Sequence, residues 1–180
     1  MTHDAPTRPQ VALLVLGSYL WVMMIMLGSI TLETFMVYPN IFYDPPTSFR
    51  VGLEFMKVKA PRDFFPPLGF ASWVLGAASL VAAWRLRPSR HWVLVSLAMI
   101  GSEGLFSMAF FWPRNTIMFV EGPAVHSAAV LRQTVEEFQR LHWGRVVFNV
   151  LGSWAIFKAF LACYRFAVCA RCADCVGSEP

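Results

Sequence analysis

Charged side chains are scarce in this sequence of 180 residues, in which Asp, Glu, Lys and Arg together make up only 14%. Soluble globular domains carry about 25% charged residues, so this shortage argues against a soluble domain. Apolar residues make up 57% of the chain, and its net charge is only +4. No run of basic residues is interleaved with aromatic ones, which argues against a nucleic-acid partner. The composition therefore predicts a membrane protein surrounded by lipids.

Metal-binding and disulfide patterns are also lacking. All four cysteines lie between Cys163 and Cys175, so disulfides cannot join distant parts of the chain. Cys169, Cys172 and Cys175 have the spacing of a metal or redox motif, but a single cluster beside a membrane helix is more typical of acylated cysteines. The four histidines form no His-Glu-x-x-His motif and no pair at metal-ligand spacing. We therefore expect neither a metal nor a cofactor.

Long apolar runs are abundant, and four of them can cross a hydrocarbon core about 30 Å thick. The first is too long for the apolar part of a cleaved signal peptide, so we expect it to remain as a transmembrane helix. Prolines 39 and 113 are expected to end the first and third runs. The predicted fold is all-α, a four-helix transmembrane bundle within residues 11–162. Its spans are about 11–37, 64–84, 92–112 and 141–162.

Two longer connections, residues 38–63 and 113–141, are predicted to form a small extracytoplasmic cap. Helical spacing of apolar residues predicts a short amphipathic helix over 48–59, and a helix over 127–139 that continues into the fourth span. The short loop Arg85–His91 holds three arginines, so the positive-inside rule makes it cytoplasmic. The sequence therefore predicts a multi-pass protein of the plasma membrane with two cytoplasmic tails. These are residues 1–10 and the polar, Cys-containing residues 163–180.

Small residues form a continuous face on the second span, where they let another helix approach closely. The neighbour is either a helix of the same bundle or a second chain, so this face also predicts a homo- or hetero-oligomer. Its members are Gly69, Ser72, Gly76 and Ser79.

Glu103 lies in the middle of the third span, where a carboxylate costs at least about 2.5 kcal/mol on insertion scales. Such a group must be protonated, paired with a cation or in contact with water. One interpretation is a proton acceptor, or a ligand for a polar group of a substrate. The other is a structural ion pair within the bundle, for which Arg145 is the best candidate.

The fourth span begins with His142, Arg145 and Asn149, which fall within roughly 60° of one another on a helix. Polar groups at the mouth of a membrane helix normally face the bundle interior or a wet cavity. This pattern predicts either a base, an anion-holding cation and an orienting amide, or a network of structural hydrogen bonds.

Glu33 ends the first span, and its position is typical of a solvated acid at the interface.

Arg114 and Asn115 follow the third span on the same predicted side as Glu33 and His142. If the fold brings these helix ends together, their polar side chains form a single cluster at the outer mouth. The sequence therefore predicts a site with His142, Arg145 and Glu103 as catalytic residues. Its predicted substrate-binding residues are Glu33, Arg114, Asn115 and Asn149.

Three short elements resemble the anthrone-oxygenase-like family of small four-helix membrane proteins. They are Glu33-Thr-Phe-Met-Val-Tyr-Pro39, Trp112-Pro-Arg-Asn115 and Leu141-His-Trp-Gly-Arg145. In the last element Arg145 matches the arginine of the family, whereas His142 stands where asparagine is usual and Leu141 where tryptophan is usual. The resemblance implies cofactor-independent oxidation of an aromatic, polyketide-like anthrone to a quinone.

The leading hypothesis is a membrane oxidoreductase that holds an apolar aromatic or lipid-like substrate between its helices. In this hypothesis His142 is the acid–base residue, Arg145 stabilises developing negative charge and Glu103 is a buried proton partner. The alternative is a non-enzymatic membrane subunit that binds a partner protein or lipid through the small-residue face of the second span.

Overall fold

The computed structural model describes the backbone of residues 8–176, and the side chains of 10–169. Every regular element in the described part is helical, so the all-α prediction is confirmed. Four helical stretches are long and apolar enough to cross a membrane. They are Gln10–Ile41, Pro61–Ala82, Arg87–Val125 and Ala128–Cys169.

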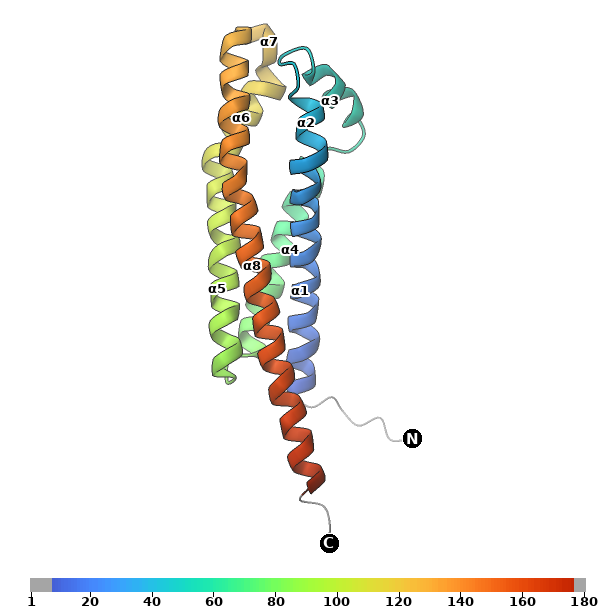
Figure 1. The fold of residues 1–180 in the computed structure, drawn as a ribbon, viewed down its shortest axis with the longest axis vertical. Coiled ribbons are helices and arrows are strands. Elements are labelled where there is room, and N and C mark those ends of the chain that lie inside the picture. Colours follow the sequence, from blue (N-terminus) through green and yellow to red (C-terminus); the bar gives the residue numbers. More distant parts are fainter. Residues whose placement is uncertain (1–7, 177–180) are drawn as a thin grey trace.

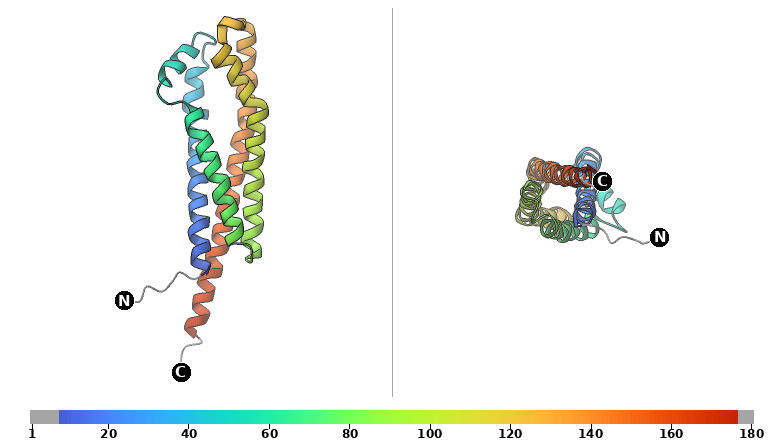
Figure 2. Two further views of the ribbon diagram at one scale, coloured as in Figure 1. Left: turned by 180° about the vertical axis from the view of Figure 1, so that it is seen from behind. Right: turned by 90° about the horizontal axis from the view of Figure 1, so that it is seen from below.

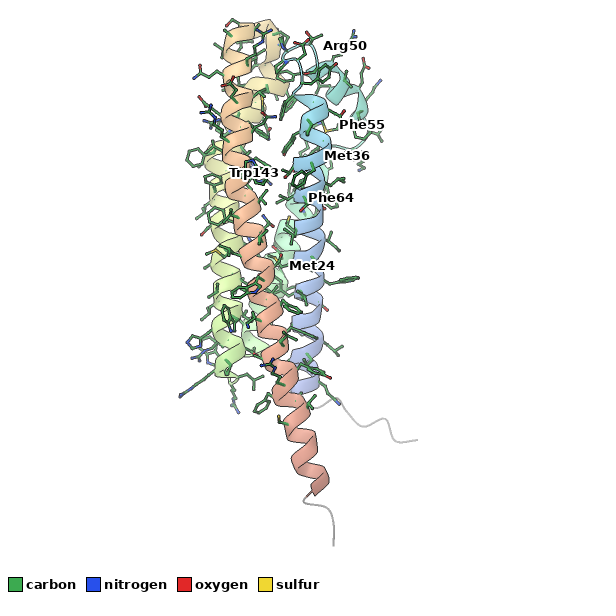
Figure 3. The ribbon with its side chains drawn as sticks, viewed as in Figure 1. Met24, Met36, Arg50, Phe55, Phe64 and Trp143 are labelled. Carbon is green, nitrogen blue, oxygen red and sulfur yellow. The ribbon has the colours of Figure 1, made fainter. Side chains whose placement is uncertain are left out.

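The four long helices lie side by side around a common axis (Figures 1 and 2). Helix α8 packs most extensively against α5 and α1, and α4 packs against α1 and α5. Apolar side chains cover the outside of this bundle, and Figure 3 marks Met24, Phe64 and Trp143 among them. Such a surface is rare on soluble monomers. The long helices are α1 (Arg8–Leu32), α4 (Pro61–Ala82), α5 (Arg87–Phe106) and α8 (Ala128–Val176).

The small-residue face of α4 packs against other helices of the same chain. Ser72 and Ser79 are fully buried, and the Ser79 hydroxyl donates to the Val15 carbonyl on α1 at 3.4 Å. A Cβ atom on Gly76 would lie 3.1 Å from the buried ring of Tyr19, so glycine lets these helices approach closely. The buried part of this face packs against helices of its own chain rather than lying open to a second one.

Prolines widen the helices instead of ending them. A π-helical turn precedes each of Pro39, Pro113 and Pro123 by two residues, and the chain stays helical through the first two prolines. Proline lacks an N–H and clashes with the carbonyl four residues earlier, and a wider turn relieves both problems. The predicted stops at Pro39 and Pro113 are therefore wrong. The turns are η1 (Glu33–Val37), η2 (Ser107–Phe111) and η3 (Thr116–Glu121).

Short helices gather at the end of the bundle where the π turns lie (Figure 1). Phe111 and Phe138 belong to an aromatic core there, with ring centroids 4.8 Å apart. The predicted amphipathic segment at 48–59 contains the helix α3. The elements of this end are α2 (Tyr38–Ile41), α3 (Phe49–Phe55), α6 (Trp112–Asn115) and α7 (Gly122–Val125).

Helix α8 runs unbroken over 49 residues. Residues 128–139 are its first turns, as their spacing predicted. Residues 163–176, the first part of the predicted tail, continue the same helix, and the end of the tail lies outside the described residues. Cys163 is buried and Cys169 is exposed, both as free thiols, and the side chains of Cys172 and Cys175 lie outside the described residues.

Candidate functional site

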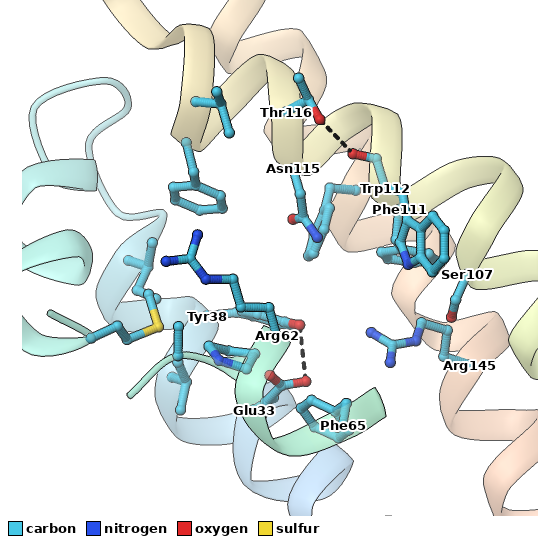
Figure 4. Close-up of a pocket in the computed structure, with 18 of the residues that line it drawn as sticks. Glu33, Tyr38, Arg62, Phe65, Ser107, Phe111, Trp112, Asn115, Thr116 and Arg145 are labelled. Carbon is cyan, nitrogen blue, oxygen red and sulfur yellow. Dashed lines mark hydrogen bonds between the residues drawn. The ribbon is translucent and has the colours of Figure 1, made fainter. Parts of the chain in front are cut away.

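A cavity of about 550 Å³ lies beside the π turns, between the aromatic core and the first turns of α4 (Figure 4). Ligand sites for small molecules commonly have volumes of about 300–1,000 Å³ and mostly apolar walls. Aromatic rings supply much of this wall. The rings are those of Tyr38, Phe65, Phe111, Trp112, Phe119 and Phe138.

All three π turns contribute to the cavity wall. Glu33 lines it from η1, Ser107 and Phe111 from η2, and Thr116 and Phe119 from η3. A π turn displaces the following side chains around the helix axis, and such turns are frequent at functional sites. The prolines after η1, η2 and η3 thus shape the walls of the cavity.

Arg145 and Glu103 form a buried ion pair next to the cavity. The Arg145 Nε–H donates to Glu103 Oε1 at 2.8 Å, and the Ser107 hydroxyl donates to the same oxygen at 2.9 Å. The two charged side chains are only 12% and 10% exposed. The Arg145 guanidinium also lies 4.9 Å from the centroid of the Phe111 ring, a cation–π contact. The ion pair suggested by the sequence is therefore present, and its Arg145 member lines the cavity.

Glu33 is the second carboxylate of the site. It is buried, with 6% of its surface exposed, so the prediction of a solvated interfacial acid is wrong. The Tyr38 hydroxyl donates to Glu33 Oε2 at 3.0 Å, as the dashed line in Figure 4 marks. Arg145 lies close enough for its positive charge to act on both Glu33 and Tyr38. Arg145 is thus ion-paired with Glu103, and its charge also acts on Glu33 without a direct contact between the two side chains.

His142 is buried behind the cavity wall rather than in it. The Thr34 hydroxyl donates to the Ile30 carbonyl at 2.7 Å, so its oxygen is free to accept from His142 Nε2–H at 2.8 Å. The imidazole packs edge-on against the Tyr38 ring, with centroids 4.7 Å apart. His142 therefore contacts the back of a cavity-lining residue, and its Nδ1 has no hydrogen-bond partner among the described residues.

Of the other predicted binding residues, one lines the cavity and two lie away from it. Asn115 lines the cavity. Arg114 points the other way, where it donates to Glu137 Oε2 at 2.7 Å and to the Phe110 carbonyl at 2.9 Å. Asn149 is fully buried below the site and donates to the Arg145 carbonyl at 3.0 Å. The structure thus brings Glu33, Asn115 and Arg145 to the cavity, with Glu103 directly behind Arg145.

Sequence reasoning missed Tyr38 and Arg62 as residues of this site. Both line the cavity, and both belong to residues 38–63, which the sequence predicts to be a connection between spans. The tyrosine sits next to Pro39 and five residues after Glu33, a spacing at which a π turn, but not an α turn, aligns the two. A proline close after an acidic residue in a membrane helix is the signal that could have identified the pairing of Glu33 with Tyr38.

Chemically, the cavity combines an acid, a phenol and two guanidinium groups within mostly apolar walls. No group of three or more His, Cys, Asp and Glu side chains converges among the described residues in a way that could hold a metal ion. Charged groups in apolar surroundings interact strongly, because little water screens them. This arrangement suits the binding of a largely apolar molecule with one acidic hydrogen and one oxygen that gains negative charge.

No family model, no curated protein and no solved structure matches this chain.

Proposed function

We propose that the chain is a multi-pass protein of the plasma membrane, with four spans and both termini cytoplasmic. Arginines 85, 87 and 90 support this orientation, since they surround the short connection between α4 and α5. That connection lies at the same end as the start of α1 and the end of α8 (Figure 1). The short helices and the cavity then form an extracytoplasmic cap at the opposite end.

We propose that the cavity oxidises an apolar, anthrone-like aromatic substrate with molecular oxygen and without a cofactor. The observation that carries this proposal is that Glu33 and Arg145 line one aromatic-walled cavity. A base and a cation suffice for such a substrate, because its carbanion is stabilised as a phenolate and reacts directly with oxygen. The resemblance of three sequence elements to the anthrone-oxygenase-like family points to the same activity.

The reaction balances with one molecule of oxygen. Glu33 removes a proton from the ring methylene, and the electron pair moves to the ketone oxygen, beside the Arg145 guanidinium. Transfer of one electron to oxygen and recombination form a carbon–oxygen bond, and the peroxide takes the proton from Glu33. Loss of the second methylene hydrogen and cleavage of the O–O bond release water. One anthrone and one O₂ thus give one anthraquinone and one water.

In this proposal Glu33 takes the role of base that the sequence assigned to His142. His142 acts as a positioning residue, since it packs against the Tyr38 ring and Tyr38 donates to Glu33. Glu103 keeps the Arg145 side chain in place through their 2.8 Å contact. Arg145 stabilises charge that develops on the substrate oxygen, the type of electrostatic contribution that is often the largest in catalysis.

Anthrone turnover in lipid nanodiscs tests the proposal. The purified protein is expected to convert anthrone to anthraquinone with one O₂ consumed per quinone, measured by chromatography and an oxygen electrode. Protein-free nanodiscs report the spontaneous rate. A rate equal to this background would contradict the proposed activity, and co-purification of a stoichiometric protein partner would then favour a partner-binding subunit.

A further inference from the structure

Arg62 is a cation of the cavity that the proposed reaction does not use. It lies in the first turn of α4 and lines the cavity, and it forms no ion pair with any described residue. The nearest acid in sequence, Asp63, is already engaged, because its Oδ2 accepts from the Ala60 backbone N–H at 2.9 Å. A guanidinium without a carboxylate partner at a cavity can pair with an anionic group of a ligand.

Arg62 belongs to the rim of the cavity rather than to its floor. The exposed lining residues lie on α3, α4, α6 and η3, and Arg62, Asn115 and Thr116 are the polar ones among them. Figure 4 shows Arg62 rising from α4 while Asn115 extends from the opposite side. The buried lining residues Glu33 and Phe111 lie further in. The cavity therefore has a mixed rim on which Arg62 is the charged residue, an aromatic middle and a polar inner end.

We propose that the substrate is a polycyclic aromatic with an anionic substituent, and that Arg62 binds this substituent at the rim. The inference rests on the proposed function for the inner end, where Glu33 and Arg145 meet the reacting carbon and oxygen. An anionic group would be repelled by Glu33 at the inner end and would lose its hydration there. At the rim it keeps contact with water and gains a charge-assisted hydrogen bond from Arg62, with the Asn115 amide nearby.

Two fluorescent probes that cannot be oxidised test this inference. Anthracene-2-carboxylate and its neutral counterpart anthracene-2-carboxamide share a ring system and lack the reactive methylene. Their dissociation constants are measured by fluorescence anisotropy with the full protein in nanodiscs, after subtraction of binding to protein-free nanodiscs. We expect wild-type protein to bind the carboxylate about tenfold more tightly, as charge-assisted hydrogen bonds are roughly twice as strong as neutral ones.

Arg62→Gln is expected to remove this preference and to leave carboxamide binding within twofold of wild type. Arg50→Gln is the matched control, because Arg50 is an exposed arginine on α3 outside the cavity lining, and it should keep the preference. Equal binding of both probes by wild type, or an unchanged preference in Arg62→Gln, would overturn the inference. A preference that depends on Arg62, in a protein without anthrone turnover, would support it while refuting the proposed function. Absence of binding by either probe would overturn both.

Discussion

Replacement of Arg145 by methionine is expected to lower the free energy of unfolding by about 3–5 kcal/mol, the largest effect of any single change in the site. The substitution leaves the Glu103 carboxylate buried without its cation. The Ser107 hydroxyl would remain its only hydrogen-bond donor among the described side chains. Reversible unfolding of the purified protein in mixed detergent micelles measures this change.

A double substitution separates the lost ion pair from lost packing. Arg145→Met combined with Glu103→Gln should recover much of the stability, because a neutral amide costs far less to bury than a lone carboxylate. Arg50→Met serves as the surface control and should change stability by less than about 0.5 kcal/mol. A loss below about 1 kcal/mol in Arg145→Met would mean that water reaches the Glu103 carboxylate more freely than the 10% exposed fraction of this side chain indicates.

Glu33→Gln is expected to reduce anthrone turnover by about 10²–10⁴-fold, the usual contribution of a general base. The glutamine amide cannot take up the methylene proton, yet its oxygen can still accept the hydrogen bond from the Tyr38 hydroxyl. The variant should therefore remain folded. Anthraquinone formation under saturating oxygen, corrected for the spontaneous rate, measures the effect.

Two further variants test whether Glu33 is the base. Glu54→Gln changes an acid on α3 that is absent from the cavity lining, and it should leave turnover unchanged. His142→Gln should lower turnover far less than Glu33→Gln, because His142 lies behind Tyr38 and does not reach the cavity. A folded His142→Gln protein with the larger loss would transfer the role of base to His142.

The long helices could be predicted from the sequence because their apolar runs are uninterrupted. The effect of Pro39 and Pro113 could not, since a proline ends a helix in water but is tolerated where neighbouring groups satisfy the freed carbonyls. The sequence predicts that a helix ends at each of these two prolines. In the structure each proline instead follows a π turn that lines the cavity. The first and third long helices therefore continue past the predicted stops into the cap.

The candidate site could be predicted only in part. Spacing along one helix predicts that His142 and Arg145 share an inward face. The structure confirms this, because the angle between two residues of one helix depends only on their separation in sequence. The partnership of Arg145 with Glu103 required knowledge of how α5 packs against α8. Arg114 and Asn115 were predicted to act together, but neighbouring helical residues point about 100° apart. Asn115 therefore faces the cavity while Arg114 turns to Glu137.

Tyr38 and Arg62 were missed for a different reason. Neither belongs to a periodic pattern, and each lies at an end of a spanning helix that the sequence predicts to be a connection, so its place at the cavity depends on tertiary packing. In a chain with so few charged side chains, every charged residue near a span boundary is a candidate for a binding role.

The position of a bound polycyclic aromatic tests the central claim most directly. An experimental structure of the protein with 2-bromoanthracene would locate the bromine by its anomalous scattering. We predict a single bromine site inside the cavity, with the ring system between Phe65 and Phe111 and within contact of Arg145. Bromine density only on the lipid-facing surface, such as the shallow groove lined by Trp21 and Phe160, would contradict the assignment of this cavity as the functional site.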